Sequence, residues 1–225
     1  LNFGNPERPE IMWQFAEAVQ GIGEACRPLD VPITGGNVSL YNETDGKPIY
    51  PTPILGVVGV IVDASRALAR AFRGEGDAIV LLGETFAELG GSEFLKIVHG
   101  EVKGRPPRLD LARERALIDL LVRAARSGLL GSAHDCSDGG FAVTIAECAF
   151  DTDGIGCAVD VPSSDSVEAA LFSESASRAV VTTSGPNTAA LLELAAGAGV
   201  PAQVIGRTGG TRVRISVGGV LAIDC

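Results

Sequence analysis

The sequence predicts a mixed α/β (α+β) protein. Apolar, strand-like runs alternate with helical patterns over residues 77–217, which is typical of an α/β domain built on a mixed sheet. The chain has 225 residues and 46% of them are hydrophobic, so it can bury one large core or two small ones. Its 29 glycines indicate many tight turns.

Composition excludes several classes of function. A formal net charge of −10 argues against a nucleic-acid-binding surface. An anionic substrate would therefore need Mg²⁺ or a local cluster of Arg and Lys. We find no signal peptide, and the apolar runs are too short or too interrupted by glycine to cross a membrane. The five cysteines are scattered without a CxxC spacing, which indicates reduced thiols and a cytoplasmic protein.

The first third of the chain predicts part of a domain. Residues 9–29 have apolar positions at helical spacing after Pro9. Residues 33–40 and 54–62 are strand candidates, joined through a turn at 45–48. A short connecting helix is expected at 64–72. We place the change of domain between Asp63 and Gly76, and we expect domains at 1–66 and 75–225.

The second domain predicts a complete α/β unit. Residues 77–83 are a buried strand pattern, and the pair Gly218-Gly219 is a two-residue hairpin turn. Further strands are expected at 155–161, 178–183, 204–207 and 212–217, and helices at 92–99, 109–127, 141–150 and 186–197. Residues 132–135 lead into the glycine pair at 139–140.

The most informative segment is residues 35–44, GGNVSLYNET. Gly35 and Gly36 let a ligand approach the backbone closely. Asn37, Ser39 and Glu43 offer the oxygen atoms that phosphate-bound Mg²⁺ and small polar substrates need. The same residue types also dominate ordinary turns, so chemistry alone leaves open a polar turn between two strands.

A family resemblance decides between these interpretations. The segment 35–44 is followed by PTPILGVVG at 51–59, and both are similar to the second half of the large, ATP-dependent subunit of phosphoribosylformylglycinamidine synthase. HDCSDGGFAVTIAE at 134–147, LFSESASR at 171–178 and the opening LNFGNPE at 1–7 fit in the same order. The resemblance covers essentially the whole chain.

The resemblance implies a fold, a reaction and a site. The fold would be the end of an aminoimidazole ribonucleotide synthetase-like N-terminal domain followed by its C-terminal domain. The enzyme, a ligase of purine biosynthesis, joins glutamine-derived ammonia to formylglycinamide ribonucleotide, after ATP phosphorylates the amide oxygen to give an iminophosphate. Gly36 would contact ATP, Asn37 would bind Mg²⁺, and Ser39 would contact formylglycinamide ribonucleotide.

The resemblance also implies partners, namely a glutaminase subunit and a small accessory subunit. The general base of the family lies in its N-terminal half, so we expect no catalytic residue in this chain. The chain lacks an initiator Met and stops within a strand pattern. We therefore expect a part of a longer protein that is inactive alone.

Two later motifs leave alternatives open. Asp135 and Asp138 precede a glycine turn into a helix, which could bind phosphate directly or contribute to an auxiliary nucleotide site. Alternatively, Asp138 caps that helix and His134 is a hydrogen-bonded core histidine. Glu174 resembles a substrate-contacting position of the family's first half, and the alternative is an ordinary polar loop.

Two rival functions remain. One is an aminoimidazole ribonucleotide synthetase-like enzyme, although NVSLYNET favours the synthase. The other is a non-catalytic half that binds nucleotide structurally and organises its partner.

Overall fold

The computed structural model describes residues 1–162 and 166–225, and the chain forms two compact units, Leu1–Val60 and Ile61–Cys225. Each unit is described by itself. The domain ranges 1–66 and 75–225 remain a prediction.

The smaller unit contains one long helix and one short hairpin. Helix α1 covers Pro9–Leu29, as predicted; it has Pro9 in its first turn and ends at Asp30, whose φ of 55° is left-handed. Strands β1 (Glu43–Thr44) and β2 (Lys47–Pro48) form the predicted hairpin. Phe3 is fully buried and meets Phe15 of α1 edge to face at 5.2 Å.

The strands predicted at 33–40 and 54–62 are wrong for this structure. Only isolated bridges form, from Asn2 to Ser39 and from Asn2 to Thr52. Residues 54–62 have no regular structure, and Val58 is 96% exposed. A strand requires a hydrogen-bonded neighbour along its length, and in this unit only Asn37 and Ser39 of these segments hydrogen-bond to another extended stretch, at residues 1–3. The apolar pattern of these two segments was therefore not sufficient to predict strands.

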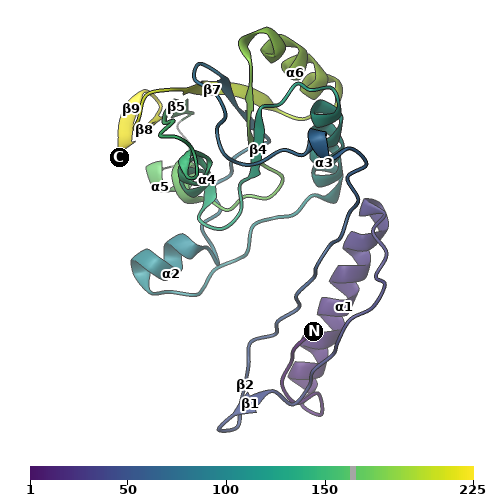
Figure 1. Ribbon diagram of the computed structural model, residues 1–225. Helices are drawn as coiled ribbons and strands as arrows, with labels where there is room; N and C mark the ends of the chain where they lie inside the picture. Colours follow the sequence, from purple (N-terminus) through teal and green to yellow (C-terminus); the bar gives the residue numbers. More distant parts are fainter. Residues whose placement is uncertain (163–165) are drawn as a thin grey trace. The chain divides into compact units, whose positions relative to one another are not determined.

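The larger unit contains a seven-stranded mixed sheet, which confirms the predicted fold class (Figure 1). The strand order is β4-β6-β3-β7-β5-β8-β9, and every neighbouring pair is antiparallel except β5 and β8. The strands are β3 (Ala78–Leu82), β4 (Ser132–Asp135), β5 (Cys157–Val161), β6 (Ala179–Thr183), β7 (Ala202–Thr208), β8 (Val213–Val217) and β9 (Val220–Asp224).

Helices cover both faces of this sheet, because the side chains of a strand alternate between its faces. Ile79 and Leu81 of β3 face a core that includes residues of α4 (Gly140–Ala149) and α5 (Val167–Phe172). Val80 and Leu82 face a second core with α3 (Leu111–Arg126) and α6 (Gly185–Gly197). All five residues of β3 are buried, which explains its uninterrupted apolar sequence.

Local sequence signals account for most helix ends. Ser92 caps α2 (Glu93–His99), and Asp110 accepts hydrogen bonds from two amides in the first turn of α3.

The prediction of a helix at 64–72 is wrong, since only a 3₁₀ turn, η1 (Ala64–Arg66), forms there. Helix α5 was not predicted, because its six residues are too few to show a helical period.

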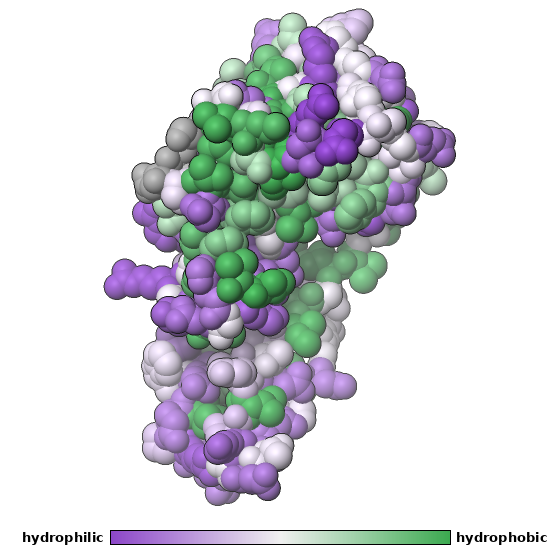
Figure 2. Space-filling view, turned by 90° about the vertical axis from the view of Figure 1, so that its left-hand side faces the viewer, coloured by the Kyte–Doolittle hydropathy of each residue, from purple (hydrophilic) through white to green (hydrophobic). Residues whose placement is uncertain are grey.

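No helix among the described residues is long and apolar enough to cross a membrane. Some apolar side chains are nevertheless part of the surface, where Figure 2 shows hydrophobic patches between polar ones. In the larger unit the exposed ones include Ile97, Val98 and Val102.

Candidate functional sites

The loop at 35–44 is open and exposed in the smaller unit. A Cβ atom added at Gly35 or Gly36 would meet nothing within 4 Å, so there is space for a ligand to approach the backbone closely. Asn37 is exposed. Ser39 is anchored by its backbone, since its carbonyl accepts from the Phe3 amide at 3.0 Å. The loop thus presents Gly36, Asn37 and Ser39 outward.

Asn42 and Glu43 hold this loop in place. The Asn42 side-chain amide donates to the carbonyl of Phe3 at 3.0 Å and to that of Ser39 at 2.9 Å. The Glu43 carboxylate accepts from the Asn5 amide at 3.3 Å and pairs with Arg8 at 3.5 Å. The polar residues of this loop therefore divide into two groups, because Asn42 and Glu43 make internal bonds whereas Asn37 faces outward.

The donor atoms of this loop fit Mg²⁺ only together with phosphate. Among residues 1–162 and 166–225, no group of three or more His, Cys, Asp or Glu could hold a metal ion. Asn37 can contribute one amide oxygen. Mg²⁺ in proteins keeps several waters and often needs only one or two protein ligands beside phosphate oxygens, so one amide oxygen fits that chemistry.

The second candidate site is a cavity of about 690 Å³ in the larger unit, lined by the 134–138 motif and the 174–179 segment. His134 lies between two carboxylates: its Nε2 is 2.7 Å from Glu147 Oε2 and its Nδ1 is 3.2 Å from Asp135 Oδ1. Its side chain is only 17% exposed. The expectation that His134 is hydrogen-bonded is confirmed, but His134 lines the cavity and belongs to neither hydrophobic core.

Asp135 faces the cavity with its charge stabilised. A hydrogen bond donated by the Ser137 hydroxyl is the main reason that the pKa of the Asp135 carboxyl lies below its usual value, and the neighbouring His134 lowers it further. The side chain is 70% exposed, so it is accessible as a ligand. A contact of Asp135 with metal or nucleotide stays a prediction.

One expectation for the glycine turn at 139–140 is wrong. Asp138 does not cap α4, because the N-cap is Gly139, which has no side chain to accept a hydrogen bond. Direct phosphate binding by this turn stays a prediction. The Gly139 amide donates to Glu174 Oε1 at 2.8 Å, so a carboxylate of the protein already occupies that donor.

Three residues of the 173–178 segment, Ser173, Ser175 and Arg178, are buried and hydrogen-bond to the loop after β3, which the sequence did not reveal. Ser173 and Ser175 are fully buried and bond the backbone of Glu88 and Phe86, respectively. The guanidinium of Arg178, also buried, donates to the carbonyls of both serines and to the Thr85 hydroxyl at 3.0 Å. Burial lowers the pKa of Arg178 from its ordinary value.

Neither interpretation of Glu174 and its flanking serines, as a substrate-contact relic or as an ordinary polar loop, describes these contacts. The signal that could have found them is the Arg five residues after Ser173, since a buried Arg needs several acceptors.

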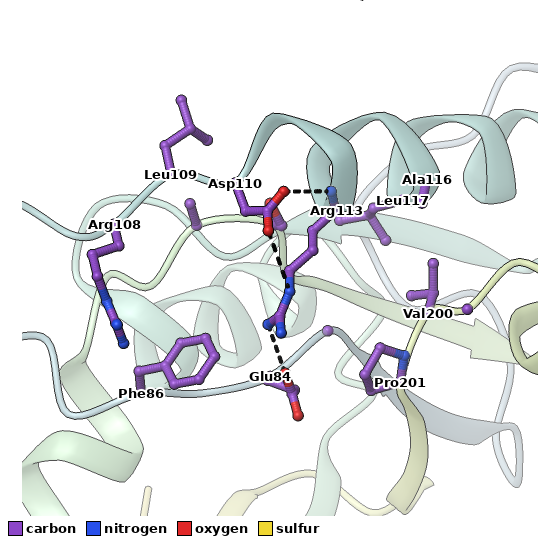
Figure 3. Close-up of a pocket in the computed structure, with 14 residues that line it drawn as sticks. Glu84, Phe86, Arg108, Leu109, Asp110, Arg113, Ala116, Leu117, Val200 and Pro201 are labelled. Carbon is purple, nitrogen blue, oxygen red and sulfur yellow. Dashed lines mark hydrogen bonds and ion pairs between the residues drawn. The ribbon is translucent and has the colours of Figure 1, made fainter. Parts of the chain in front are cut away.

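A third cavity, of about 590 Å³, lies between the loop after β3 and the first turns of α3 (Figure 3). The guanidinium carbons of Arg108 and Arg113 lie 5.5 and 5.7 Å from the centre of the Phe86 ring. Arg113 pairs with Glu84 at 2.7 Å and Arg108 with Glu88 at 3.2 Å. Because both cations are paired, this cavity offers no surplus positive charge for a phosphate.

The five cysteines are free thiols, as predicted, and three are buried. Burial raises the pKa of Cys148 to about 12 and that of Cys157 to about 11. It also raises the pKa of Cys136. Thiols with such pKa values are poor nucleophiles.

Comparison with known proteins identifies the class. Residues 74–218 match the C-terminal domain of AIR synthase related proteins, and residues 1–61 match the N-terminal domain of the same class. The chain therefore belongs to the AIR synthase related protein family, and the fold expected from the sequence resemblance is confirmed.

Curated relatives show a more specific similarity within this family. The chain is 50% identical over 224 residues to phosphoribosylformylglycinamidine synthase subunit PurL of Anaeromyxobacter dehalogenans, with 96% of this chain and 30% of that protein covered. It is 47% identical over 219 residues to the same subunit of Moorella thermoacetica, covering 97% and 30%. The resemblance found in the motifs is confirmed, and the chain spans about 30% of the length of these relatives.

Solved structures share the fold. "T. maritima PurL complexed with FGAR" superposes with a TM-score of 0.74 at 20% identity, over 91% of this chain and 35% of that one. "Structure of PurLQS from Thermotoga maritima" gives 0.73 at 16% identity, over 100% and 36%. "T. maritima PurL complexed with ATP" gives 0.69 at 18% identity, over 92% and 34%.

Proposed function

We propose that this chain is part of a phosphoribosylformylglycinamidine synthase. In this proposal the complete enzyme uses ATP and glutamine-derived ammonia to convert formylglycinamide ribonucleotide into formylglycinamidine ribonucleotide in purine biosynthesis. The observation that carries the proposal is the 50% identity to PurL subunits over nearly the whole chain. The PurL protein of Thermotoga maritima has been solved in complexes with ATP and with FGAR, which is consistent with it.

Within that enzyme, we assign the 35–44 loop to nucleotide and substrate. The open backbone at Gly36 allows ATP to approach, and the outward Asn37 offers an amide oxygen to phosphate-bound Mg²⁺. Ser39 offers a hydroxyl to formylglycinamide ribonucleotide after releasing Asn42 Oδ1, to which it donates at 3.2 Å. When bound, Mg²⁺ would supply charge stabilisation to the transferring phosphate.

Partners and compartment follow from the same proposal. Ammonia would come from a glutaminase subunit, and a small accessory subunit would complete the assembly. The solved PurLQS of Thermotoga maritima, which shares the fold, is consistent with an enzyme of several components. The enzyme would act in the cytoplasm.

The decisive experiment compares two asparagines of one loop in the full-length protein that contains this sequence. Asn37→Ala removes an outward amide and should lower turnover about a hundredfold or more, with little change in melting temperature. Asn42→Ala removes three hydrogen bonds within the loop, two donated to backbone carbonyls and one accepted from the Ser39 hydroxyl, and should lower stability by about 1–3 kcal/mol.

Ser39→Ala completes the set. It should weaken binding of the ribonucleotide by roughly 0.5–1.5 kcal/mol, the net value of one hydrogen bond. If Asn37→Ala kept near-normal turnover at saturating Mg²⁺ and ATP while its melting temperature fell as far as that of Asn42→Ala, the site assignment would be wrong.

A further inference from the structure

The glycine turn at the start of α4 has an anionic partner inside the protein. One oxygen of Glu174, Oε1, accepts from the Gly139 amide at 2.8 Å and from the Glu93 amide at 2.9 Å. Gly139 opens α4 and Glu93 opens α2. A carboxylate at such amides is favoured, because the backbone N–H groups there lack helical acceptors and carry partial positive charge.

The backbone of Glu174 is fixed by the residues around it. Its own amide donates to the Glu88 carbonyl at 3.3 Å, and its two neighbours, Ser173 and Ser175, are fully buried. Arg178 donates to the carbonyls of both serines. The backbone position of Glu174 is therefore set by buried, hydrogen-bonded neighbours, and from that position its carboxylate reaches both amides.

The glycines serve this closed arrangement. A Cβ added at Gly140 would come into severe overlap, at 2.4 Å, with the Ser173 carbonyl oxygen, and both Gly139 and Gly140 have left-handed backbone, with φ of 78° and 69°. The small size of Gly140 lets the backbone of the turn pack against the backbone of the segment that carries Glu174. A Cβ added at Gly139 would instead overlap the Val143 side chain of α4.

We infer that Glu174 is a positioning residue whose carboxylate is the built-in anionic ligand of the 139–140 turn. The same carboxylate joins α2 and α4 to the 173–178 segment. It also closes the turn to phosphate from the cavity that Glu174 lines. This role concerns the order of the larger unit and is independent of the proposed activity. If Glu174 acts through its charge, an external carboxylate should replace its side chain in a Glu174→Ala variant. A role in packing alone would not allow this replacement.

The test uses amide hydrogen exchange, followed by mass spectrometry, in the full-length protein that contains this sequence. Glu174→Ala should speed exchange in the peptides containing Glu93 and Gly139 about tenfold or more, because charge-assisted hydrogen bonds to both amides are lost. Glu174→Gln keeps an oxygen acceptor without the charge and should give a smaller rise. Glu193→Gln, in α6, is the matched control and should leave both peptides unchanged.

Chemical rescue separates positioning from packing. Formate should restore protection of both peptides in Glu174→Ala, while chloride at the same ionic strength should not. Equal responses to formate and chloride would overturn the inference, and so would a Glu174→Ala protein whose two peptides exchange as in the control. If Glu174→Ala does not fold, Glu174→Gln decides: exchange equal to that of Glu193→Gln at both peptides overturns the inference, and faster exchange at both supports it.

Discussion

Asp135 illustrates how neighbouring groups determine the ionisation of one side chain. The Ser137 hydroxyl is the largest cause of its lowered pKa. A carboxyl whose pKa is lower in the folded state than in the unfolded state stabilises the fold above the unfolded value, and this contribution is lost as the pH falls through the folded value. The exposure of Asp135 keeps the contribution small.

We therefore expect Ser137→Ala to raise the pKa of Asp135 and to weaken the protein slightly at neutral pH. The stability difference from the unmodified protein should shrink as the pH falls below the ordinary Asp value of 3.8. Urea unfolding of both proteins at a series of pH values measures this stability difference. A difference that stays constant with pH would show that the lost hydroxyl acts on something other than this carboxyl.

Removal of the buried Arg178 side chain should lower stability strongly. Arg178 is 2% exposed and its guanidinium serves three acceptors, so Arg178→Ala should leave buried carbonyls unpaired and cost roughly 3–5 kcal/mol. The exposed Arg123 of α3 is the control, and Arg123→Ala should change stability by less than about 0.5 kcal/mol. Similar urea midpoints for the two variants would show that the hydrogen bonds of Arg178 do not stabilise the fold.

At the scale of elements, the β8–β9 hairpin tests a turn that the sequence did predict. Gly218 and Gly219 have φ of 58° and 81°, and both central residues of a type I′ turn need positive φ. Gly219→Ala should cost about 1–2 kcal/mol, purely through backbone strain, since an added Cβ meets no atom within 4 Å.

Gly197→Ala is the matched control for that hairpin. Gly197 is the last residue of α6, also has open space for a Cβ and has no positive φ, so alanine there should be neutral or stabilising by up to about 1 kcal/mol. Thermal unfolding of the two variants measures the comparison. Equal effects would mean that φ does not decide the cost.

The elements found from sequence are those whose signals are local. Helix α1 matches its prediction, and the predicted helix at 186–197 differs from α6 by one residue, because proline marks each start and the apolar spacing is clear. The segments at 33–40 and 54–62 failed for the opposite reason. Strand formation depends on a partner that the apolar pattern does not specify.

The same distinction applies to the candidate sites. The polar loop at 35–44 was found because its residues are consecutive. The contacts of Glu174 were missed because their partners lie 35 and 81 residues away in the chain. Residue types could suggest that Gly139 binds an anion, yet only the folded arrangement shows that the anion is a side chain of the protein.

At the scale of the whole molecule, the hydrophobic core is distributed unequally. Both hydrophobic clusters lie entirely within Ile61–Cys225, on opposite faces of one sheet. Within Leu1–Val60, Phe3 and Ile11 are the buried hydrophobic residues among those described, and many apolar side chains such as Val57 and Val60 are exposed. Stability should follow this difference, since burial of apolar area is the main favourable term in folding.

We predict that residues 61–225 expressed alone fold and unfold in one cooperative transition, and that residues 1–60 alone do not. Seven hydrogen-bonded strands with helices on both faces satisfy the backbone of the larger unit, whereas the smaller one relies on a single helix and a two-residue ladder. Urea unfolding of the larger unit, followed by far-ultraviolet and by near-ultraviolet circular dichroism, should give coincident transitions. Non-coincident transitions for 61–225, or a cooperative transition for 1–60, would show that folding is shared between the units and not carried by the larger one.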